Sequence, residues 1–410
     1  MKLDPVSLLN VSMNLDSNRI SVGRLALHRG QIFFEYDSGF IERGLEISPF
    51  KLPLNRGAIA CEDRVFEGLF GVFNDSLPDG WGRLLLDRSV QAKGVAYQSL
   101  TPLDRLAHVG EQAMGALIYS PDYSGLTKAS EDLNLVRIEQ EVNKVLDGEP
   151  TDILRELLAL GGSSAGARPK ILVGYNHHDH RVIHGANLLP KGFEPWMVKF
   201  PSTLDQQDIA NIEYAYSLMA KAAGVMMPET ILFREKEGKS YFGVKRFDRV
   251  RNQRVHMHTV AGLLHADHRI PSLDYENIMR CTLALTKDMK EVEKVFRLAV
   301  FNVFAHNRDD HSKNFSFLMD ERGAWRFAPA YDLTFSYGPG REHSSMVMGE
   351  GRNPGAKELR KLGQKFQIKR TEEIIEEVKT TILDWKIYAK QGNVSEQSCA
   401  IIASELNKIK

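Results

Sequence analysis

The spacing of apolar residues in the first part of the chain predicts a small mixed module. Residues 20–27 and 31–36 are strand-like around a His-Arg-Gly turn, and residues 114–119 have the composition of a closing strand. Between them, the turn at 77–80 leads into residues 81–88, which have the composition of a helix. The aspartates of this stretch, Asp75, Asp79 and Asp87, are interpreted as turn and first-turn residues.

A Ser-, Pro-, Gly- and Asp-rich stretch at 120–132 marks the first domain boundary. Two helices are predicted next, at 135–146 and 152–160, with Thr151 as N-cap of the second and Gly161 after its end.

A strand at 194–200 carries one lysine, Lys199, among apolar residues. The helix predicted at 208–223 follows and carries Glu213, which is either the partner of that lysine or a solvated helix residue. A hairpin is then predicted from residues 230–233 and 241–245.

The remaining chain is mainly helical by its apolar pattern. Residues 291–305 predict a buried helix, and residues 371–390 predict an amphipathic one. The Gly-, Ser- and Arg-rich stretch from 333 to about 356 is expected to be a mobile surface loop.

The polar stretch after the buried helix contains the strongest chemical pattern. Asp309 and Asn314 have the D-x-x-x-x-N spacing of a kinase catalytic loop, in which the Asp accepts the proton of the attacking hydroxyl and the Asn holds Mg²⁺. Apolar runs around a short turn at 320–323 predict a hairpin that returns the chain to its start, so Asp332 is expected beside Asn314 as a second metal ligand.

Two other interpretations of this stretch remain open. It is also compatible with a charged surface loop, or with a hydrolytic metal site built from His306, Asp309, Asp310 and His311, although the spacing matches no known ligand template. The His-rich residues 176–180 are most simply a polar turn, with metal binding as the alternative.

A glycine-, alanine- and serine-rich loop precedes the lysine strand. Small residues at Ser163, Ser164, Ala165 and Gly166 let backbone N–H groups approach phosphate closely, although the loop is not a Walker A motif. Lys199 is then either a phosphate-binding lysine or a gatekeeper on an edge strand.

The segment that follows the hairpin crosses between the predicted lobes. Backbone groups around Lys245 and Phe247 are expected at the adenine edge, and Asp248 is expected at the ribose or as a cap.

Composition narrows the function classes. Lysine plus arginine and aspartate plus glutamate both total 53, so no global basic field indicates nucleic-acid binding. The three distant cysteines fit neither disulfides nor a metal site, which favours a reducing cytoplasm. We find no secretory signal and no apolar run of membrane-spanning length, and so expect no membrane partner.

These motifs resemble the HipA family of bacterial toxin Ser/Thr kinases. The matching strings are residues 163–170, 197–200, 244–249, 309–315 and 331–334. The resemblance implies an α+β, two-lobed, protein-kinase-like (phosphoinositide-kinase-like) fold with an N-terminal subdomain at 1–125, an N-lobe at 126–248 and a helical C-lobe at 249–410.

The resemblance also implies ATP and Mg²⁺ as cofactors, with His311 and Lys313 among the ATP-binding residues. It further implies autophosphorylation at Ser163 or Ser164 and a protein substrate such as an aminoacyl-tRNA synthetase. The expected partner is a helix-turn-helix antitoxin of the HipB type, through which the pair binds operator DNA. In some related systems the N-terminal module is a separate antitoxin protein, whereas here it is fused.

Two other function classes remain as alternatives. A small-molecule phosphotransferase of kinase-like fold would share Asp309, Asn314 and Asp332, but needs an acceptor pocket near the C-lobe. A non-catalytic co-repressor subunit has no need of a base and two metal ligands, so the intact string argues against it.

Overall fold

The computed structural model describes most of the chain. The described residues are 5–15, 18–92, 94–124, 132–151, 153–161, 166, 168–185, 188–202, 205–235, 238–250 and 253–408. Within them, no helix is both long enough and apolar enough to cross a membrane.

The first part of the chain forms a five-stranded antiparallel sheet with the order β4-β3-β2-β1-β5. Its elements are β1 (Leu8–Leu15), β2 (Asn18–His28), β3 (Gln31–Tyr36), α1 (Ser38–Arg43), β4 (Ala58–Ala60), α2 (Gly71–Asn74), α4 (Pro102–Val109) and β5 (Leu117–Ser120). The three predicted strands are present, and β1 is an additional strand. It buries the alternating residues Leu9, Val11 and Met13, as expected for a strand with one core-facing side.

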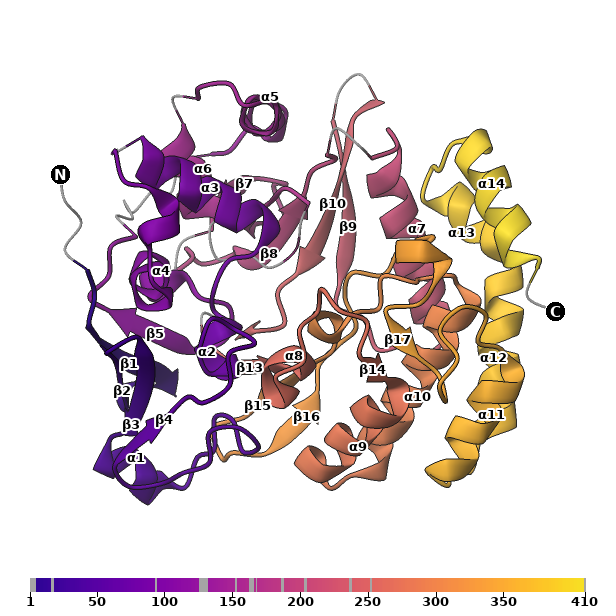
Figure 1. Cartoon of the computed structure of the whole chain (residues 1–410). Helices are drawn as coiled ribbons and strands as arrows, with labels where there is room; N and C mark the ends of the chain where they lie inside the picture. Colours follow the sequence, from indigo (N-terminus) through magenta and orange to yellow (C-terminus); the bar gives the residue numbers. More distant parts are fainter. Residues whose placement is uncertain are drawn as a thin grey trace.

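A second antiparallel sheet, with the order β7-β6-β8-β10-β9, forms the N-lobe. Its elements are α3 (Gly80–Gln91), α5 (Leu135–Asp147), α6 (Leu154–Gly161), β6 (Lys170–Tyr175), β7 (Val182–His184), β8 (Glu194–Lys199), α7 (Ile209–Ala222), β9 (Thr230–Arg234) and β10 (Ser240–Lys245). Helix α3 lies beside α6 (Figure 1), and its Trp81 and Leu85 are buried in the N-lobe core. By packing, α3 therefore belongs to the N-lobe, although it falls within the predicted domain 1–125.

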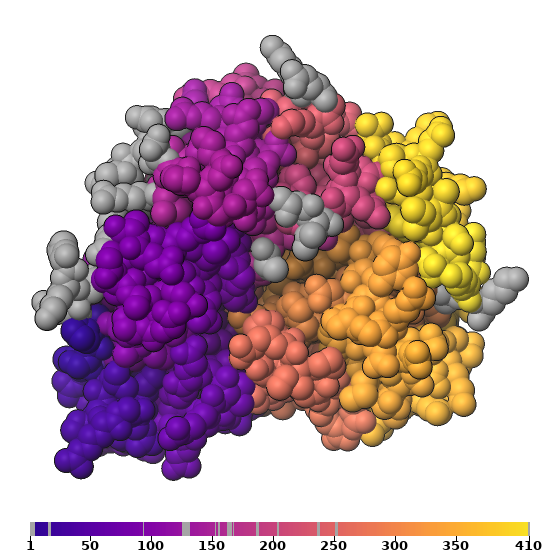
Figure 2. Space-filling model, turned by 45° about the horizontal axis from the view of Figure 1, so that its top comes forward, coloured from indigo at the N-terminus to yellow at the C-terminus, as the bar shows by residue number. Residues whose placement is uncertain are grey.

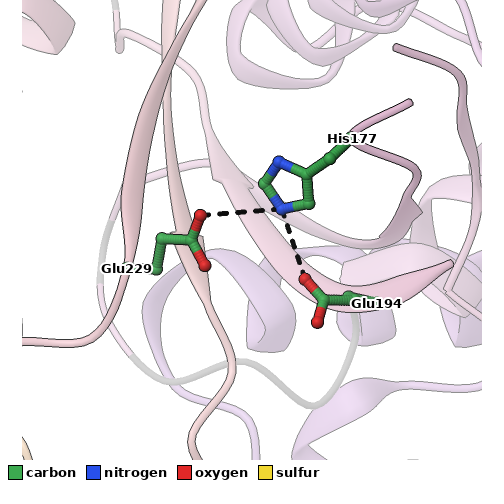
Figure 3. A group of neighbouring side chains, drawn as sticks. All are labelled: His177, Glu194 and Glu229. Atoms are coloured by element: carbon green, nitrogen blue, oxygen red, sulfur yellow. Dashed lines mark ion pairs between the residues drawn. The ribbon is translucent and has the colours of Figure 1, made fainter. Parts of the chain in front are cut away.

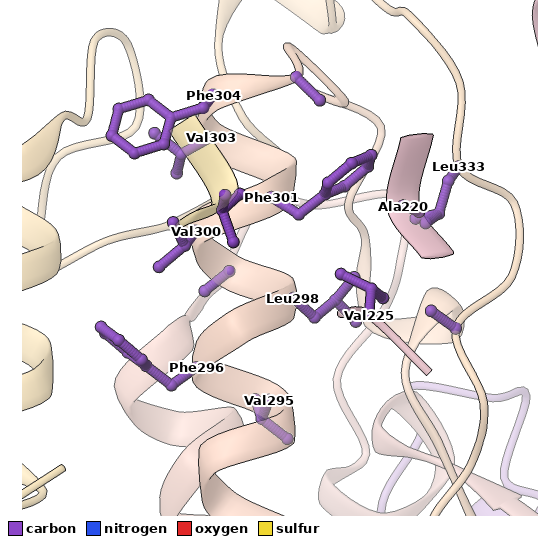
Figure 4. Close-up of a cluster of buried hydrophobic side chains, with 14 of the residues drawn as sticks. Ala220, Val225, Val295, Phe296, Leu298, Val300, Phe301, Val303, Phe304 and Leu333 are labelled. Atoms are coloured by element: carbon purple, nitrogen blue, oxygen red, sulfur yellow. The ribbon is translucent and has the colours of Figure 1, made fainter. Parts of the chain in front are cut away.

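The last part of the chain is mainly helical. Its helices are α8 (Val260–Leu264), α9 (Tyr275–Thr286), α10 (Met289–Phe304), α11 (Ala356–Lys365), α12 (Thr371–Leu383), α13 (Trp385–Gln391) and α14 (Glu396–Leu406). Its strands are β11 (Arg249–Val250), β12 (Gln253–Arg254), β13 (His256–Thr259), β14 (Leu273–Asp274), β15 (Ser316–Met319), β16 (Trp325–Phe327) and β17 (Ser345–Met346). Helix α10 is its centre: apolar side chains project from several sides of it (Figure 4), and residues 298–304 are all buried. A helical segment that is buried on all sides must be surrounded by protein, as this second half of α10 is.

The N-terminal module is joined to the C-lobe along a seam that also appears in the space-filling view (Figure 2). Three histidines of the C-lobe segment 256–265 reach across it. The ring nitrogens of His256 and His258 lie 2.9 Å from the Ile47 carbonyl and 3.0 Å from the Ser48 hydroxyl, respectively. His265 accepts the Gly71 N–H at 3.0 Å. Because Nε2 of His265 is an acceptor, its Nδ1 carries the proton and donates it to Asp63 at 2.9 Å.

Asp75 lies in the turn after α2, as predicted, and is also the acidic partner in this seam. Its carboxylate lies 2.6 Å from Nδ1 of His258 and accepts the N–H and the hydroxyl of Thr259, both at 2.7 Å. Asp75, His258 and Ser48 thus form a carboxylate–imidazole–hydroxyl chain. Ser48 and His258 are 1% and 0% exposed, so no substrate reaches the hydroxyl and the chain holds the module in place.

Asp248 forms a second connection between the N-terminal module and the rest of the chain. The expectation that it contacts the ribose or acts as a cap was wrong. Its carboxylate accepts the Gly115 N–H at 2.8 Å and pairs with Arg246 and Arg249, each at 2.7 Å. Only 1% of the residue is exposed. Burial raises the Asp248 pKa, but the two guanidinium groups outweigh it and hold the pKa well below its usual range. The carboxylate is committed to the seam.

Acid is expected to weaken this fold through His256. Burial lowers its pKa from 6.5 to about 4, so between these values the unfolded chain binds a proton that the folded chain does not. The stability contribution is complete above pH 6.5 and decreases as the pH falls toward 4, where the loss reaches about 3 kcal/mol. Denaturant unfolding of the wild type and His256→Gln at pH 7, 5.5 and 4 measures this loss of stability.

The expected result is a smaller loss of stability with acid in His256→Gln than in the wild type. His28→Gln is the matched control, because His28 is exposed on β2. Equal pH dependence in all three proteins contradicts the role of His256.

Candidate active site

The loop that follows α10 is fixed by buried polar groups. Asn302 donates to the Tyr275 hydroxyl at 2.8 Å and accepts from Asn307 at 3.0 Å. The hydroxyl of Tyr275 in turn donates to Asp310 at 2.9 Å. Residues 302–310 are therefore held from inside by side chains whose hydrogen-bonding groups have no access to water.

Asp310 is the anchor of this network. It is 0% exposed, and its carboxylate also accepts the Ser345 N–H at 3.1 Å and lies 3.0 Å from Nδ1 of His343. The stretch 333–356, expected to be a mobile surface loop, thus contributes buried residues and strand β17, which pairs with β14. The expectation was wrong because its small polar residues cover a buried carboxylate.

Asp309 and Asn314 lie on the outer side of the same loop. Asn314 donates to the Asp309 backbone carbonyl at 2.7 Å, which closes the loop on itself. Asp309 is exposed, yet the protein around it removes enough water to raise the pKa of its carboxyl. The Asp332 and Asp310 charges act in the same direction, while His311 and Arg168 oppose them.

The β15–β16 hairpin brings Asp332 back to this loop, as predicted. Phe317 pairs with Phe327 across the hairpin, and the Tyr331 hydroxyl donates to the Lys313 carbonyl. Asp332 adopts a φ of +59°, a left-handed conformation that costs a residue other than glycine about 1 kcal/mol or more. Such strain persists only where the surrounding contacts define the position of the residue.

Lys199 connects the two lobes at this point. Its ammonium donates to Asp332 at 2.6 Å and forms an ion pair with Glu213 of α7. Burial alone would lower the Lys199 pKa, but the two carboxylates outweigh it and raise the pKa. Burial would likewise raise the Asp332 pKa, but Lys199 and Lys170 hold it well below the usual range. The structure thus contains the Lys199–Glu213 pair, which was one of the two alternatives for Glu213.

Three further cations gather around these residues. Lys170 lies opposite Lys199 in the β6–β8 register, and burial lowers its pKa to about 8. Arg168 contacts Asp205 at 3.0 Å and reaches Glu213 at 3.9 Å. Lys313 pairs with Asp79 at 2.6 Å. Several carboxylates and four cations in one place suit a metal ion together with phosphate groups.

Lys170 is absent from the set of phosphate-binding residues predicted above. Its place at the start of a strand directly after the glycine-rich loop was a usable signal. What sequence alone does not give is the antiparallel register that places it opposite Lys199.

Gly166 is the described part of the glycine-rich loop. Its φ is +101°, a backbone conformation that favours glycine, and its Cα faces the end of the Lys170 side chain. Ser163, Ser164 and Ala165 lie outside the described residues.

The other predicted ATP-binding residues divide into two groups. Phe247 lies near the site, with its ring 5.6 Å from that of Tyr331, and His311 faces His268 at 5.5 Å. Lys245, in contrast, points into a different cluster, where its ammonium pairs with Glu194 at 2.7 Å and Glu229 at 3.5 Å. Its backbone N–H donates to the Glu229 carbonyl. The Lys245 side chain is thus committed to these two glutamates.

That cluster is also the one group of metal-ligand type among the described residues. Nε2 of His177 lies 3.2 Å from Glu194 and 3.6 Å from Glu229, so both carboxylates approach the same ring nitrogen (Figure 3). Lys245 already supplies positive charge to both carboxylates, so the group is an exposed ion-pair cluster.

The rival hydrolytic site of His306, Asp309, Asp310 and His311 does not assemble in the described part of the chain. His306 is buried with its ring 6.4 Å from that of Phe335, and Asp310 faces Tyr275 and His343. The side chains of His306 and Asp310 therefore point to other neighbours, whereas Asp309 is exposed.

Models of two protein domains match this chain. The HipA N-terminal domain matches residues 13–120, and the HipA-like C-terminal domain matches residues 162–385. In Sinorhizobium fredii, the protein named "Putative kinase Y4mE" is 27% identical over 341 residues, covering 76% of this chain and 74% of its own. "Putative kinase Y4dM" of the same organism is 28% identical over 167 residues, covering 37% of this chain but only 40% of its own length.

A solved structure shares the fold over nearly the whole chain. It is HipA of Shewanella oneidensis, in a complex with HipB and its operator DNA, with a TM-score of 0.70 and 16% identity. The match covers 97% of this chain and 95% of that one. Its two-lobed α+β architecture is thus the fold that the sequence predicted.

Truncation of the two adjacent aspartates is expected to change the free energy of unfolding by very different amounts. Asp310→Ala leaves the Tyr275 hydroxyl and the Ser345 N–H without their acceptor, which should lower the free energy of unfolding by about 2–4 kcal/mol. Asp309→Ala removes an exposed carboxylate and should change it by less than about 0.5 kcal/mol. Chemical denaturation of the three proteins measures this, and equal losses would contradict the anchoring role.

Proposed function

We propose that this chain, which belongs to the HipA family, is an ATP- and Mg²⁺-dependent serine/threonine protein kinase. The observation that carries the proposal is Lys199, whose buried ammonium joins Glu213 to Asp332 beside the Asp309–Asn314 loop. Lysine, glutamate, two metal-binding residues and a base are the parts from which protein kinases build phosphoryl transfer.

The residues divide the work as follows. Asn314 and Asp332 offer the amide and carboxylate oxygens that suit Mg²⁺. Lys199, Lys170 and Lys313 supply positive charge to phosphate groups, and Glu213 holds Lys199 in place. Bound Mg²⁺ supplies further charge neutralisation at the phosphates.

Asp309 orients the acceptor hydroxyl and takes its proton as the new oxygen–phosphorus bond forms and the bond to ADP breaks. Its raised pKa brings it closer to the range in which a carboxylate both accepts and releases a proton near neutrality.

The biological role follows from the family. We propose that the chain is the toxin of a toxin–antitoxin pair, with a HipB-type antitoxin as partner and operator DNA bound through it. The complex of Shewanella HipA with HipB and its operator supports this partner class. An aminoacyl-tRNA synthetase is the proposed substrate, and incubation of the kinase with labelled ATP and a cell lysate identifies the protein that is labelled.

Asp309→Ala and Asp332→Ala are both expected to lower phosphoryl transfer by at least about 1,000-fold, for different reasons. Loss of Asp332 removes a metal ligand, so Mg²⁺-dependent ATP binding should weaken as well. Loss of Asp309 should leave that binding nearly intact. Transfer of labelled phosphate and calorimetric ATP titration separate the two, and full activity in Asp309→Ala would refute the base assignment.

Autophosphorylation at Ser163 or Ser164 is expected to switch the enzyme off. A phosphoserine adds a charge of about −1.5 to −2, which repels nucleotide phosphates and competes for the same donors. Mass spectrometry of protein made in cells should find the phosphate on the wild type and not on Asp309→Ala. The same phosphate on both proteins would assign it to another kinase.

A further inference from the structure

Asp79 of the N-terminal module reaches into the candidate active site. It directly precedes α3, whose Trp81 and Leu85 are buried in the N-lobe core. The start of α3 is thus fixed by packing, which gives the adjacent Asp79 carboxylate a defined position. The sequence predicts a turn residue here, but the structure gives the side chain different partners.

The carboxylate bridges two loops that are far apart in sequence. One oxygen accepts from the Lys313 ammonium at 2.6 Å, and the other accepts the backbone N–H of Gly166. The Gly166 carbonyl in turn accepts the Trp81 N–H at 3.2 Å. Asp79 occupies the N-cap position of α3 yet makes no capping hydrogen bond, although capping is the usual role of an aspartate there.

The two donors are of the kind that phosphate groups use. A lysine ammonium and the backbone N–H groups of a glycine-rich loop both bind phosphate oxygens, which are anionic acceptors like carboxylate oxygens. Lys170, whose ammonium lies against Gly166, adds positive charge on the same side. A carboxylate at this position therefore satisfies donors that a phosphate group would otherwise engage.

We propose that Asp79 is an internal anion that competes with the phosphates of the bound nucleotide for Lys313 and the Gly166 N–H, so that the N-terminal module sets nucleotide affinity. The nucleotide part of this statement rests on the proposed kinase function. The competition itself needs only an anion with several phosphate groups. It makes Asp79 an affinity-determining residue that precedes both kinase sheets and loops in sequence and sits at the start of α3, which packs against the N-lobe.

Asp79→Asn isolates the charge, because an amide oxygen of the same shape still accepts one hydrogen bond. Calorimetric titrations with Mg²⁺–ATP, tripolyphosphate and adenosine are compared for this variant and the wild type. We expect Asp79→Asn to bind ATP and tripolyphosphate about fivefold more tightly, since an ion pair of this kind contributes about 1 kcal/mol. Binding of adenosine, which carries no phosphate, should not change.

Two further variants make the test specific. Asp87→Asn changes the same charge on the same helix, where Asp87 lies 3.8 Å from Arg83 and outside the site, and it should titrate like the wild type. In a Lys313→Gln background, Asp79→Asn should give a smaller gain, because one of the two shared donors is absent. Asp79→Ser replaces Asp79→Asn if thermal unfolding shows that the asparagine variant does not fold.

The outcomes separate this proposal from the kinase assignment. If the wild type and Asp79→Asn bind both ATP and tripolyphosphate equally, the kinase function stands and the competition is refuted. If no variant binds ATP but Asp79→Asn binds tripolyphosphate more tightly than the wild type, the competition stands and the nucleotide function is refuted. An equal gain in the Lys313→Gln background also refutes the competition, since a general charge effect then explains it.

Discussion

The buried positive charge of Lys199 needs negatively charged partners, and the arrangement of the lobes depends on this constraint. A buried charge is tolerated only with close partners, and truncating one member of such a pair typically costs about 3–5 kcal/mol. Here one partner, Glu213, comes from α7 of the N-lobe, and the other, Asp332, follows the β15–β16 hairpin of the C-lobe. The hairpin register and the left-handed backbone at Asp332 place the second carboxylate, so the same interaction that satisfies Lys199 also assembles the site.

The N-terminal module is integrated with this site and is not merely appended to it. The seam of His256, His258 and His265 fixes it to the C-lobe, while Asp248 ties Gly115 to the crossing between the lobes. Helix α3 continues into the N-lobe core. The module therefore contacts both lobes, and Asp79 reaches the catalytic loop from the start of α3. This explains why a boundary drawn at residue 125 from composition does not coincide with the boundaries of the hydrophobic cores.

Local patterns in the sequence were sufficient to predict most helices and strands and to identify the motif residues. The spacing of Asp309 and Asn314 and the apolar runs around 320–323 are local properties, and both appear in the structure as a loop and a hairpin. Strand β1 had a usable alternation of Leu9, Val11 and Met13, interrupted by polar residues that face the other side. The stretch 333–356 was misjudged because small polar residues are typical both of surface loops and of segments that cover a buried carboxylate.

The sequence by itself determined the helix and strand periods, the kinase-type spacing and the order of lysine, glutamate and aspartate along the chain, because these depend on neighbouring residues. The tertiary structure decided the roles of Asp75, Asp79, Asp248 and Lys170. Each of these is a charged residue with at least one contact far away in sequence, and an aspartate after a turn looks the same whether it faces water or a lysine 234 positions away. Strand register and domain packing bring such partners together, and these are set by the burial of whole surfaces, which no short stretch of sequence encodes.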